Sequence, residues 1–329
     1  MDSAKSILVT GGAGFIGSHL VERLLQEGSR VVVVDDLSTG KRSNLDAASG
    51  IASGQLEIIE GRVSDVLPGM NPEDFAASYH LAAAVGVRLV LEAPIHTIEN
   101  NVHETSAALE FARRGNVPTL IASTSEVYGK GFGAPFSEDD DVVYGPTTCA
   151  RWSYACSKAI DEYLALAHAK EGLAPTVIVR FFNTVGPRQV GEYGMVLPRF
   201  VQAAMEGAPL EVYGDGLQSR CFCDVRDVVP AIIALLGRPD AYGRVYNIGS
   251  AQPITIMALA ERVRSRLGSD SDIVCVPYAE AFDGELDDLR AREPDLTRIR
   301  EILDFTPGIP LDTTIDDLAA EWAVGRSRS

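Results

Sequence analysis

Basic side chains are scarce in this sequence of 329 residues, which contains 29 Lys and Arg against 46 Asp and Glu. At a net charge of −17 at pH 7, the surface repels phosphate backbones and anionic lipids. The shortage of basic side chains therefore argues against a nucleic acid or a membrane surface as the binding partner. A phosphorylated substrate would need a local basic pocket that opposes the field of the whole chain.

Cysteine and long apolar runs are also in short supply. The five cysteines form no Cys-x-x-Cys pair, and Cys221 and Cys223 have no histidine close by in sequence, so we expect no metal site and free thiols in a reducing compartment. No apolar run approaches the ~18 residues of a membrane span. The polar start at residues 1–6 does not resemble a signal peptide, and we expect a cytoplasmic protein.

Hydrophobic residues make up 46% of the chain, enough to bury a large core. In the first half, β-branched runs alternate with stretches of helical periodicity. Strands are expected at residues 7–9, 31–34, 56–59, 79–81, 119–122 and 176–179, and helices at 14–26, 97–114 and 153–170. Continuous apolar strands separated by helices predict a parallel sheet covered on both faces, which is a Rossmann-type doubly wound α/β fold.

The pattern becomes looser after residue 182. Further strands are expected at 210–213 and 245–248, and further helices at 196–206 and 256–267. We predict a Rossmann domain at residues 1–182 and a smaller C-terminal substrate domain at 183–329, which closes over the carboxyl edge of the sheet. Parts of this second half are expected to return to the first domain.

The segment ILVTGGAGFIG at residues 7–17 is the strongest local signal. Gly11 permits a tight turn, Gly14 lets a pyrophosphate approach the backbone, and Gly17 lets the following helix pack against the strand. The pyrophosphate then meets the free N–H groups at the helix start. Asp35, at the end of the next expected strand, is placed to accept both ribose hydroxyls and to repel a 2′-phosphate, so the turn predicts NAD rather than NADP.

Tyr154 and Lys158 lie four residues apart, on one face of an expected helix. A free tyrosine, with a pKa near ~10, is a poor base at neutral pH. A neighbouring ammonium and a positive nicotinamide ring would both lower that pKa. Thr124 ends an expected strand at the edge where ligands bind, so its hydroxyl can reach a sugar hydroxyl beside Tyr154.

Together these motifs resemble the extended short-chain dehydrogenase/reductase family of nucleotide-sugar epimerases, dehydratases and decarboxylases. The resemblance covers nearly the whole chain. It rests on residues 10–17, 80–83, 123–126, 154–158, 180–188 and 220–227. It implies an enzyme with tightly bound NAD and a UDP-sugar substrate. A dinucleotide sensor without catalysis is the contrasting reading, but such relatives usually lack the tyrosine or the lysine.

The resemblance also implies roles for individual residues. Tyr154 would take the proton of the sugar 4-hydroxyl while C4 gives up a hydride, and Lys158 would hold the cofactor ribose. The implied catalytic set is Tyr154, Lys158, Thr124, Ser125 and Glu126. The implied cofactor contacts are Gly11, Gly14, Phe15, Ile16, Gly17, Asp35, Asp36, Asp65, Val66, Leu81, Ala82, Ala83, Tyr154 and Lys158. The implied substrate contacts are Asn183, Arg188, Val196, Leu197, Tyr213, Arg220 and Arg292, with Arg220 and Arg292 on the phosphates.

The 4-keto sugar that such an enzyme forms can be dehydrated, decarboxylated or re-reduced to the 4-epimer. Different residues of the chain favour different reactions. Ser125 is a poor acid for a leaving hydroxyl, which disfavours dehydration. Thr-Ser-Glu at 124–126 and the segments 151–154 and 220–227 resemble UDP-glucuronate decarboxylases, and many 4-epimerases carry a small residue in place of Glu126. In contrast, Gly-Pro-Arg-Gln at 186–189 resembles uronate 4-epimerases, where Arg188 would clamp a C6 carboxylate and suppress loss of carbon dioxide.

On this balance we expect a UDP-sugar 4-epimerase, with UDP-glucuronate as a candidate substrate. A UDP-glucuronate decarboxylase is the alternative, and an enzyme like dTDP-glucose 4,6-dehydratase comes third. The resemblance further implies a homodimer built from the helices at 97–114 and 153–170. Leu164, Ala165 and Ala169 are its expected contacts, unless they form an ordinary core stripe that faces the sheet.

Overall fold

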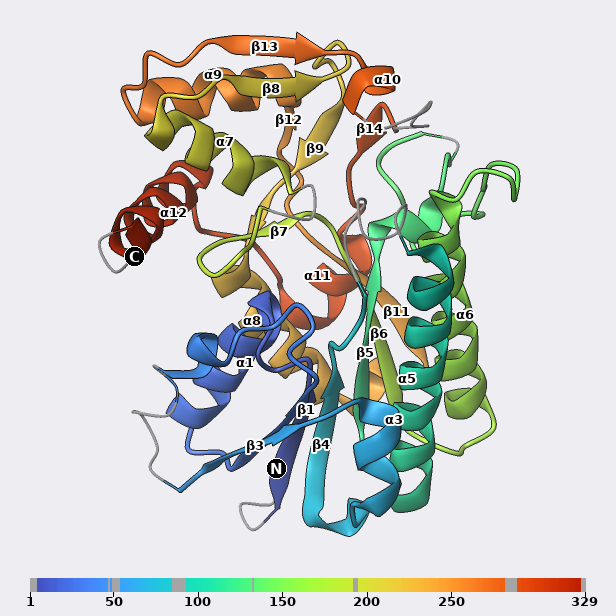
Figure 1. The fold of residues 1–329 in the computed structure, drawn as a ribbon. Coiled ribbons are helices and arrows are strands. Elements are labelled where there is room, and N and C mark those ends of the chain that lie inside the picture. The colour runs from blue at the N-terminus through green and yellow to red at the C-terminus, as the bar shows by residue number, and fades with distance from the viewer. Residues whose placement is uncertain are drawn as a thin grey trace.

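A sheet of seven parallel strands lies at the centre of the protein, which is described here from a computed structural model (Figure 1). The described residues are 5–46, 48, 54–84, 93–131, 133–191, 195–281 and 289–326; residues 1–4, part of the polar start considered above, lie outside them. In spatial order the strands are β3 (Leu56–Glu60), β2 (Val31–Asp35), β1 (Ser6–Thr10), β4 (Phe75–His80), β5 (Thr119–Thr124), β6 (Thr176–Phe181) and β11 (Arg244–Ile248). All neighbouring pairs are parallel, so the predicted Rossmann-type doubly wound fold is confirmed.

Helices cover both faces of this sheet (Figure 1). On one face lie α1 (Phe15–Gln26), α8 (Val225–Leu236) and α11 (Thr297–Leu303), and on the other lie α3 (Val63–Val66), α5 (Pro94–Gly115) and α6 (Trp152–Lys170). Each helix buries an apolar stripe against the strands, for example Leu20 and Leu24 of α1 against Val33 of β2. Burial of this kind is the main source of stability for both layers.

The predicted strands and helices of the first half are all present, with one clear difference in extent. The strand expected at residues 79–81 runs from Phe75 to His80, so Leu81 falls just beyond it. Ala76, Ala77 and Ser78 are not β-branched, and the sequence pattern therefore missed the first part of this strand. Pairing of β4 with β1 and β5 on both sides compensates for that weak local preference.

The second half of the chain contributes to the sheet as well as to a smaller subdomain. β11, α8 and α11 lie beyond residue 182 and pack in the Rossmann layers. The smaller subdomain contains β7 (Thr184–Val185) paired with β10 (Cys223–Asp224), β8 (Leu210–Tyr213) paired with β13 (Ile273–Val276), and β9 (Ser219–Cys221) between β12 (Pro253–Thr255) and β14 (Ala291–Arg292). Its helices are α7 (Val196–Glu206), α9 (Ile256–Arg266), α10 (Tyr278–Ala281) and α12 (Leu311–Arg326).

Helices α7, α9 and α12 share the core of the subdomain, with Phe200, Leu259 and Ile315 buried among them. Short 3₁₀ helices complete the described elements: η1 (Arg42–Leu45), η2 (Leu67–Gly69), η3 (Pro72–Asp74), η4 (Ser125–Tyr128) and η5 (Pro239–Ala241). In the part of the chain that the structure describes, no helix combines the length and the apolar composition of a membrane span.

Candidate active site

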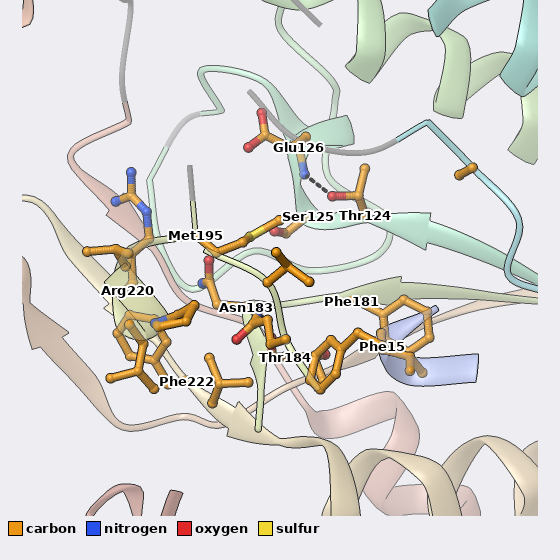
Figure 2. A pocket seen from close by; sticks show the side chains of 18 of the residues that line it. Phe15, Thr124, Ser125, Glu126, Phe181, Asn183, Thr184, Met195, Arg220 and Phe222 are labelled. Atoms are coloured by element: carbon orange, nitrogen blue, oxygen red, sulfur yellow. Dashed lines mark hydrogen bonds between the residues drawn. The ribbon is translucent and has the colours of Figure 1, made fainter. Parts of the chain in front are cut away.

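A cavity of about 470 Å³ lies between the carboxyl edge of the sheet and the smaller subdomain. Ligands of doubly wound folds bind at this edge, where the strand order reverses beside β1 and β4. The predicted site residues in its lining are Gly11, Gly14, Phe15, Ile16, Gly17, Leu81, Ala83, Thr124, Ser125, Glu126, Tyr154, Lys158, Asn183, Arg188, Val196, Leu197, Tyr213, Arg220 and Arg292. Figure 2 shows part of this lining, from Phe15 at one end to Glu126 and Arg220 at the other.

The glycine turn between β1 and α1 is shaped for a pyrophosphate. Gly11 has a φ of 69°, and a Cβ there would lie 2.7 Å from the backbone nitrogen of Ala82. A Cβ on Gly17 would lie 2.1 Å from the carbonyl oxygen of Gly11. Gly14 precedes α1, and no side chain caps the helix there. The first N–H groups of α1 are therefore available to a phosphate, and the turn fits a dinucleotide.

Asp35 holds this turn in place. Its Oδ2 accepts the N–H of Ala13 (2.8 Å) and its Oδ1 accepts the N–H of Leu37 (2.9 Å). Burial raises the pKa of Asp35, while these two backbone hydrogen bonds lower it. The carboxylate oxygens keep further lone pairs, so a role on the ribose stays a prediction.

The expected adenine side of the cofactor site is only partly in the cavity wall. Asp36 accepts from Ser38, Asp65 is exposed on α3, and among the described residues neither lines the cavity. Asp35, Val66 and Ala82 are likewise not part of the lining, and the cofactor roles of all five stay predictions. The lining at this end has two residues that the sequence did not indicate, Thr39 and Asn44.

Tyr154 and Lys158 project from the first turns of α6 into the cavity wall. Burial raises the pKa of Tyr154, the charges of Glu126 and Asp161 raise it further, and a hydrogen bond with Thr124 lowers it. The net shift in the chain by itself is therefore upward, and the lowering expected from Lys158 and a bound nicotinamide ring stays a prediction. The ammonium of Lys158 donates to Asp161 Oδ2 at 2.7 Å, and the two opposite charges largely cancel.

Glu126 forms the charged centre at the far end of the cavity. Its Oε1 lies 2.7 Å from Nη1 of Arg292, and its Oε2 lies 3.2 Å from Nη2 of Arg151. Burial alone would raise the pKa of Glu126, but Arg292, Arg151 and Arg220 lower it to about 2. The carboxylate is therefore ionised at neutral pH. Nε of Arg292 is buried, with no hydrogen-bond partner among the described residues.

Two of the predicted arginines line the cavity as expected but already have carboxylate partners in the chain, and their roles on a substrate stay predictions. Arg292 was expected on the phosphates, but it lies against Glu126, beside the predicted catalytic residues. Arg188 was expected to clamp a sugar carboxylate, but its Nη2 pairs with Glu22 of α1 at 2.6 Å. The arginines that meet at Glu126 are Arg292 and Arg151, and tertiary folding alone brings Arg292 there.

The remaining predicted substrate residues line the cavity on the subdomain side. Asn183 donates to the carbonyl of Cys221 (3.2 Å), and Arg220 donates to the carbonyl of Leu289 (2.9 Å). The ring of Tyr213 stacks under the guanidinium of Arg199, 4.4 Å from the ring centre. Lining residues that the sequence analysis did not assign to the site include Arg151, Phe181, Thr184, Gln189, Met195, Gln218, Phe222, Ile256 and Tyr278. Several of them lie in segments that carry the family resemblance (151–154, 180–189 and 220–227), but only the folded chain places their side chains in the cavity wall.

Comparisons with a family model and with known proteins point to the same family. The model of the NAD dependent epimerase/dehydratase family matches residues 7–249. The chain is 42% identical over 307 residues to the UDP-N-acetyl-alpha-D-glucosaminuronate decarboxylase of Bacillus cytotoxicus, covering 93% of this chain and 94% of that protein. It is 35% identical over 310 residues to UDP-glucuronic acid decarboxylase 6 of Arabidopsis thaliana, covering 94% and 86%.

Solved structures of enzymes that catalyse other reactions have the same fold. UDP-glucose 4-epimerase from Thermotoga maritima, solved with UDP-glucose, matches with a TM-score of 0.86 at 26% identity, covering 98% of this chain and 99% of that one. The dTDP-glucose 4,6-dehydratase of Bacillus anthracis, solved in complex with NAD, matches with a TM-score of 0.83 at 27% identity, covering 98% of each chain. The fold is thus common to enzymes with different outcomes, and the site must decide among them.

The glycine turn yields a direct prediction. In Gly17→Ala, the added Cβ would overlap the carbonyl of Gly11 and displace the turn, so we expect NAD affinity to fall by roughly tenfold or more. Isothermal titration calorimetry with NAD measures the change. Gly69→Ala is the matched control, because a Cβ on Gly69 meets nothing within 4 Å. Equal NAD affinity in Gly17→Ala and the wild type would contradict this assignment of the turn.

Proposed function

The chain belongs to the NAD-dependent epimerase/dehydratase family, and we propose that it decarboxylates a UDP-uronic acid with NAD as its cofactor. The observation that carries this proposal is the 42% identity, over 93% of this chain, with a UDP-N-acetyl-alpha-D-glucosaminuronate decarboxylase; beside it, Arg151, Arg292 and Arg220 give the site near Glu126 an excess of positive charge. A C6 carboxylate is the substrate group that such an excess would bind. The order expected from the sequence is therefore reversed, with the decarboxylase ahead of the 4-epimerase.

The first step uses the residues at the ends of β5 and α6. Tyr154 takes the proton of the sugar 4-hydroxyl, and the hydroxyl of Thr124 orients that oxygen through a hydrogen bond. NAD, when bound at the glycine turn, supplies the acceptor for the hydride that leaves C4. The product of this step is a 4-keto sugar whose C6 carboxylate is β to the new carbonyl.

The second step is loss of carbon dioxide. The bond between C5 and C6 breaks, and its electron pair is delocalised from C5 onto the C4 oxygen. Arg292, through its unpartnered Nε–H, and Arg151 hold the carboxylate before this step, with Glu126 fixing both guanidinium groups. C5 would then take up a proton from water. Once C4 had regained the hydride, Tyr154 would return its proton to the C4 oxygen, and the product would be a UDP-pentose or its 2-acetamido analogue.

A product assay tests the proposed reaction. With UDP-glucuronate and UDP-N-acetylglucosaminuronate as substrates, we expect mass spectrometry to find a product lighter by one carbon dioxide for at least one of them. Tyr154→Phe should lower the rate by about 10²–10⁴-fold, because it removes the group that accepts the proton. An isomer of unchanged mass would assign the chain as a 4-epimerase instead. Absence of turnover with both substrates would contradict the proposal.

The role of Arg292 can be tested by substitution, with the nearby Arg290 as the control. Arg292→Ala removes a buried guanidinium that faces the reacting carboxylate, and we expect kcat/KM to fall by roughly 10²–10³-fold. NAD affinity should stay unchanged. Arg290→Ala is the matched control, since this arginine lies in the adjacent turn with a side chain that is 74% exposed. Similar losses in both variants would show that Arg292 acts only through general charge or folding.

We also propose that the protein is a homodimer, in which helices α5 and α6 of two copies pack together. Ala165, an expected contact, is wrong as a dimer residue because it is fully buried against the sheet, and Leu164 packs on the same cluster. Ile95 of α5 and Tyr163 of α6 are instead 71% and 70% exposed, and Ile160 is 45% exposed. Large apolar side chains exposed on one helix pair are typical of an interface.

Light scattering after size-exclusion chromatography tests the dimer. We expect the mass of two chains for the wild type and of one chain for Tyr163→Glu, because the new charge would be buried without a partner. Leu217→Glu, at a site in the smaller subdomain that is 65% exposed, should stay dimeric. A single-chain mass for the wild type would refute the homodimer.

A further inference from the structure

The ion pair between Lys158 and Asp161 is fully enclosed in the protein. Lys158 is 2% exposed and Asp161 is 0% exposed, although both lie on α6 one turn apart. Nζ of Lys158 is 2.7 Å from Oδ2 of Asp161. In the part of the chain that the structure describes, Oδ1 of Asp161 has no hydrogen-bond partner. Two charges have thus been removed from water on one face of the catalytic helix.

The groups that face this pair from the sheet and from α5 carry no charge at neutral pH, so Asp161 is the counter-ion of Lys158. His80 of β4 is the titratable group that faces it from the sheet, and burial, with a smaller effect of Lys158, lowers the pKa of His80 to about 3. His80 is therefore neutral at neutral pH, between the hydroxyls of Thr10 (2.8 Å) and Thr105 (3.2 Å). From α5, Thr105 contributes no charge; burial raises the pKa of Asp161, and a hydrogen bond between the Thr105 hydroxyl and the carboxyl group of Asp161 lowers it.

The other charged groups near α6 already have partners. Glu162, the next residue on the helix, is held by Arg180 of β6 at 2.7 Å. Glu126 of η4, whose charge acts on Tyr154 one turn before Lys158, is held by Arg292 of β14. Ser123 of β5 donates to Glu162 and carries no charge. Neither carboxylate is free to replace Asp161 beside the ammonium.

We propose that Asp161 is a positioning residue for the reaction, the buried counter-ion that keeps Lys158 protonated and fixed toward the cofactor ribose and Tyr154. A buried ammonium without a partner pays the full cost of leaving water and gives up its proton near neutral pH. Asp161 removes that penalty, since its carboxylate is buried with the ammonium and lies on the same helix. The role of Lys158 on the ribose rests on the proposed function and on the family to which the chain belongs.

The pH dependence of NAD binding tests the proposal without any sugar substrate. In Asp161→Asn the ammonium loses its partner, so NAD affinity should fall by about tenfold between roughly pH 6 and pH 9 as Lys158 is deprotonated. The wild type and Asp161→Glu should show no such fall. Glu171→Gln, which removes an exposed carboxylate at the end of α6, is the matched control. A folded Asp161→Asn with the pH profile of the wild type overturns the proposal.

A double variant covers the case in which Asp161→Asn does not fold. Asp161→Asn with Lys158→Met removes both charges, and we expect it to fold with a urea midpoint near that of the wild type. If the double variant also fails to fold, Asp161 has a structural role unrelated to the ammonium and the proposal is overturned. Failure of the decarboxylation assay would instead sink the proposed function, and the NAD titration would be unaffected by it.

Discussion

The pairing of Glu126 with Arg292 and Arg151 is the interaction on which the rest of the site depends. It joins three segments far apart in the sequence: the 3₁₀ helix after β5, the residue before α6, and β14 near the C-terminal end. A carboxylate in this position is stable only while arginines compensate its charge. The sugar end of the cavity is therefore complete only after the C-terminal part of the chain has folded back onto the sheet.

This cluster would also allow an acidic protein to bind the anionic substrate proposed for it. The net charge of −17 would repel the proposed UDP-uronic acid at long range, whereas dissolved ions screen that field over about 8 Å at physiological salt. Inside the cavity screening is weaker, and the buried arginines dominate. Arg220 and Arg292 are register neighbours in β9 and β14, so the small sheet of the subdomain presents two guanidinium groups side by side.

Two buried charges in the predicted site are each paired with a buried side chain of opposite charge. Asp161 balances Lys158 on α6, and the arginines balance Glu126. Burial, and after it the charges of Glu126 and Asp161, raise the pKa of Tyr154 above its ordinary value, so the tyrosine keeps its proton in the chain alone. A positive charge that arrives with the oxidised cofactor would act in the opposite direction, which ties the basicity of Tyr154 to an occupied cofactor site.

Local chemistry in the sequence was sufficient for the Rossmann layers, the glycine turn and the pairing of Tyr154 with Lys158, because strand periodicity, positive-φ glycines and helical spacing act over a few residues. The same reasoning did not indicate that Arg292 pairs with Glu126 or that Arg188 pairs with Glu22, since the partner of an arginine depends on which distant carboxylate folding brings near it. It also missed Asp161, whose importance comes from complete burial. Sequence determined the cofactor and the family; only the tertiary structure decided which charges meet in the cavity where the sugar is proposed to bind.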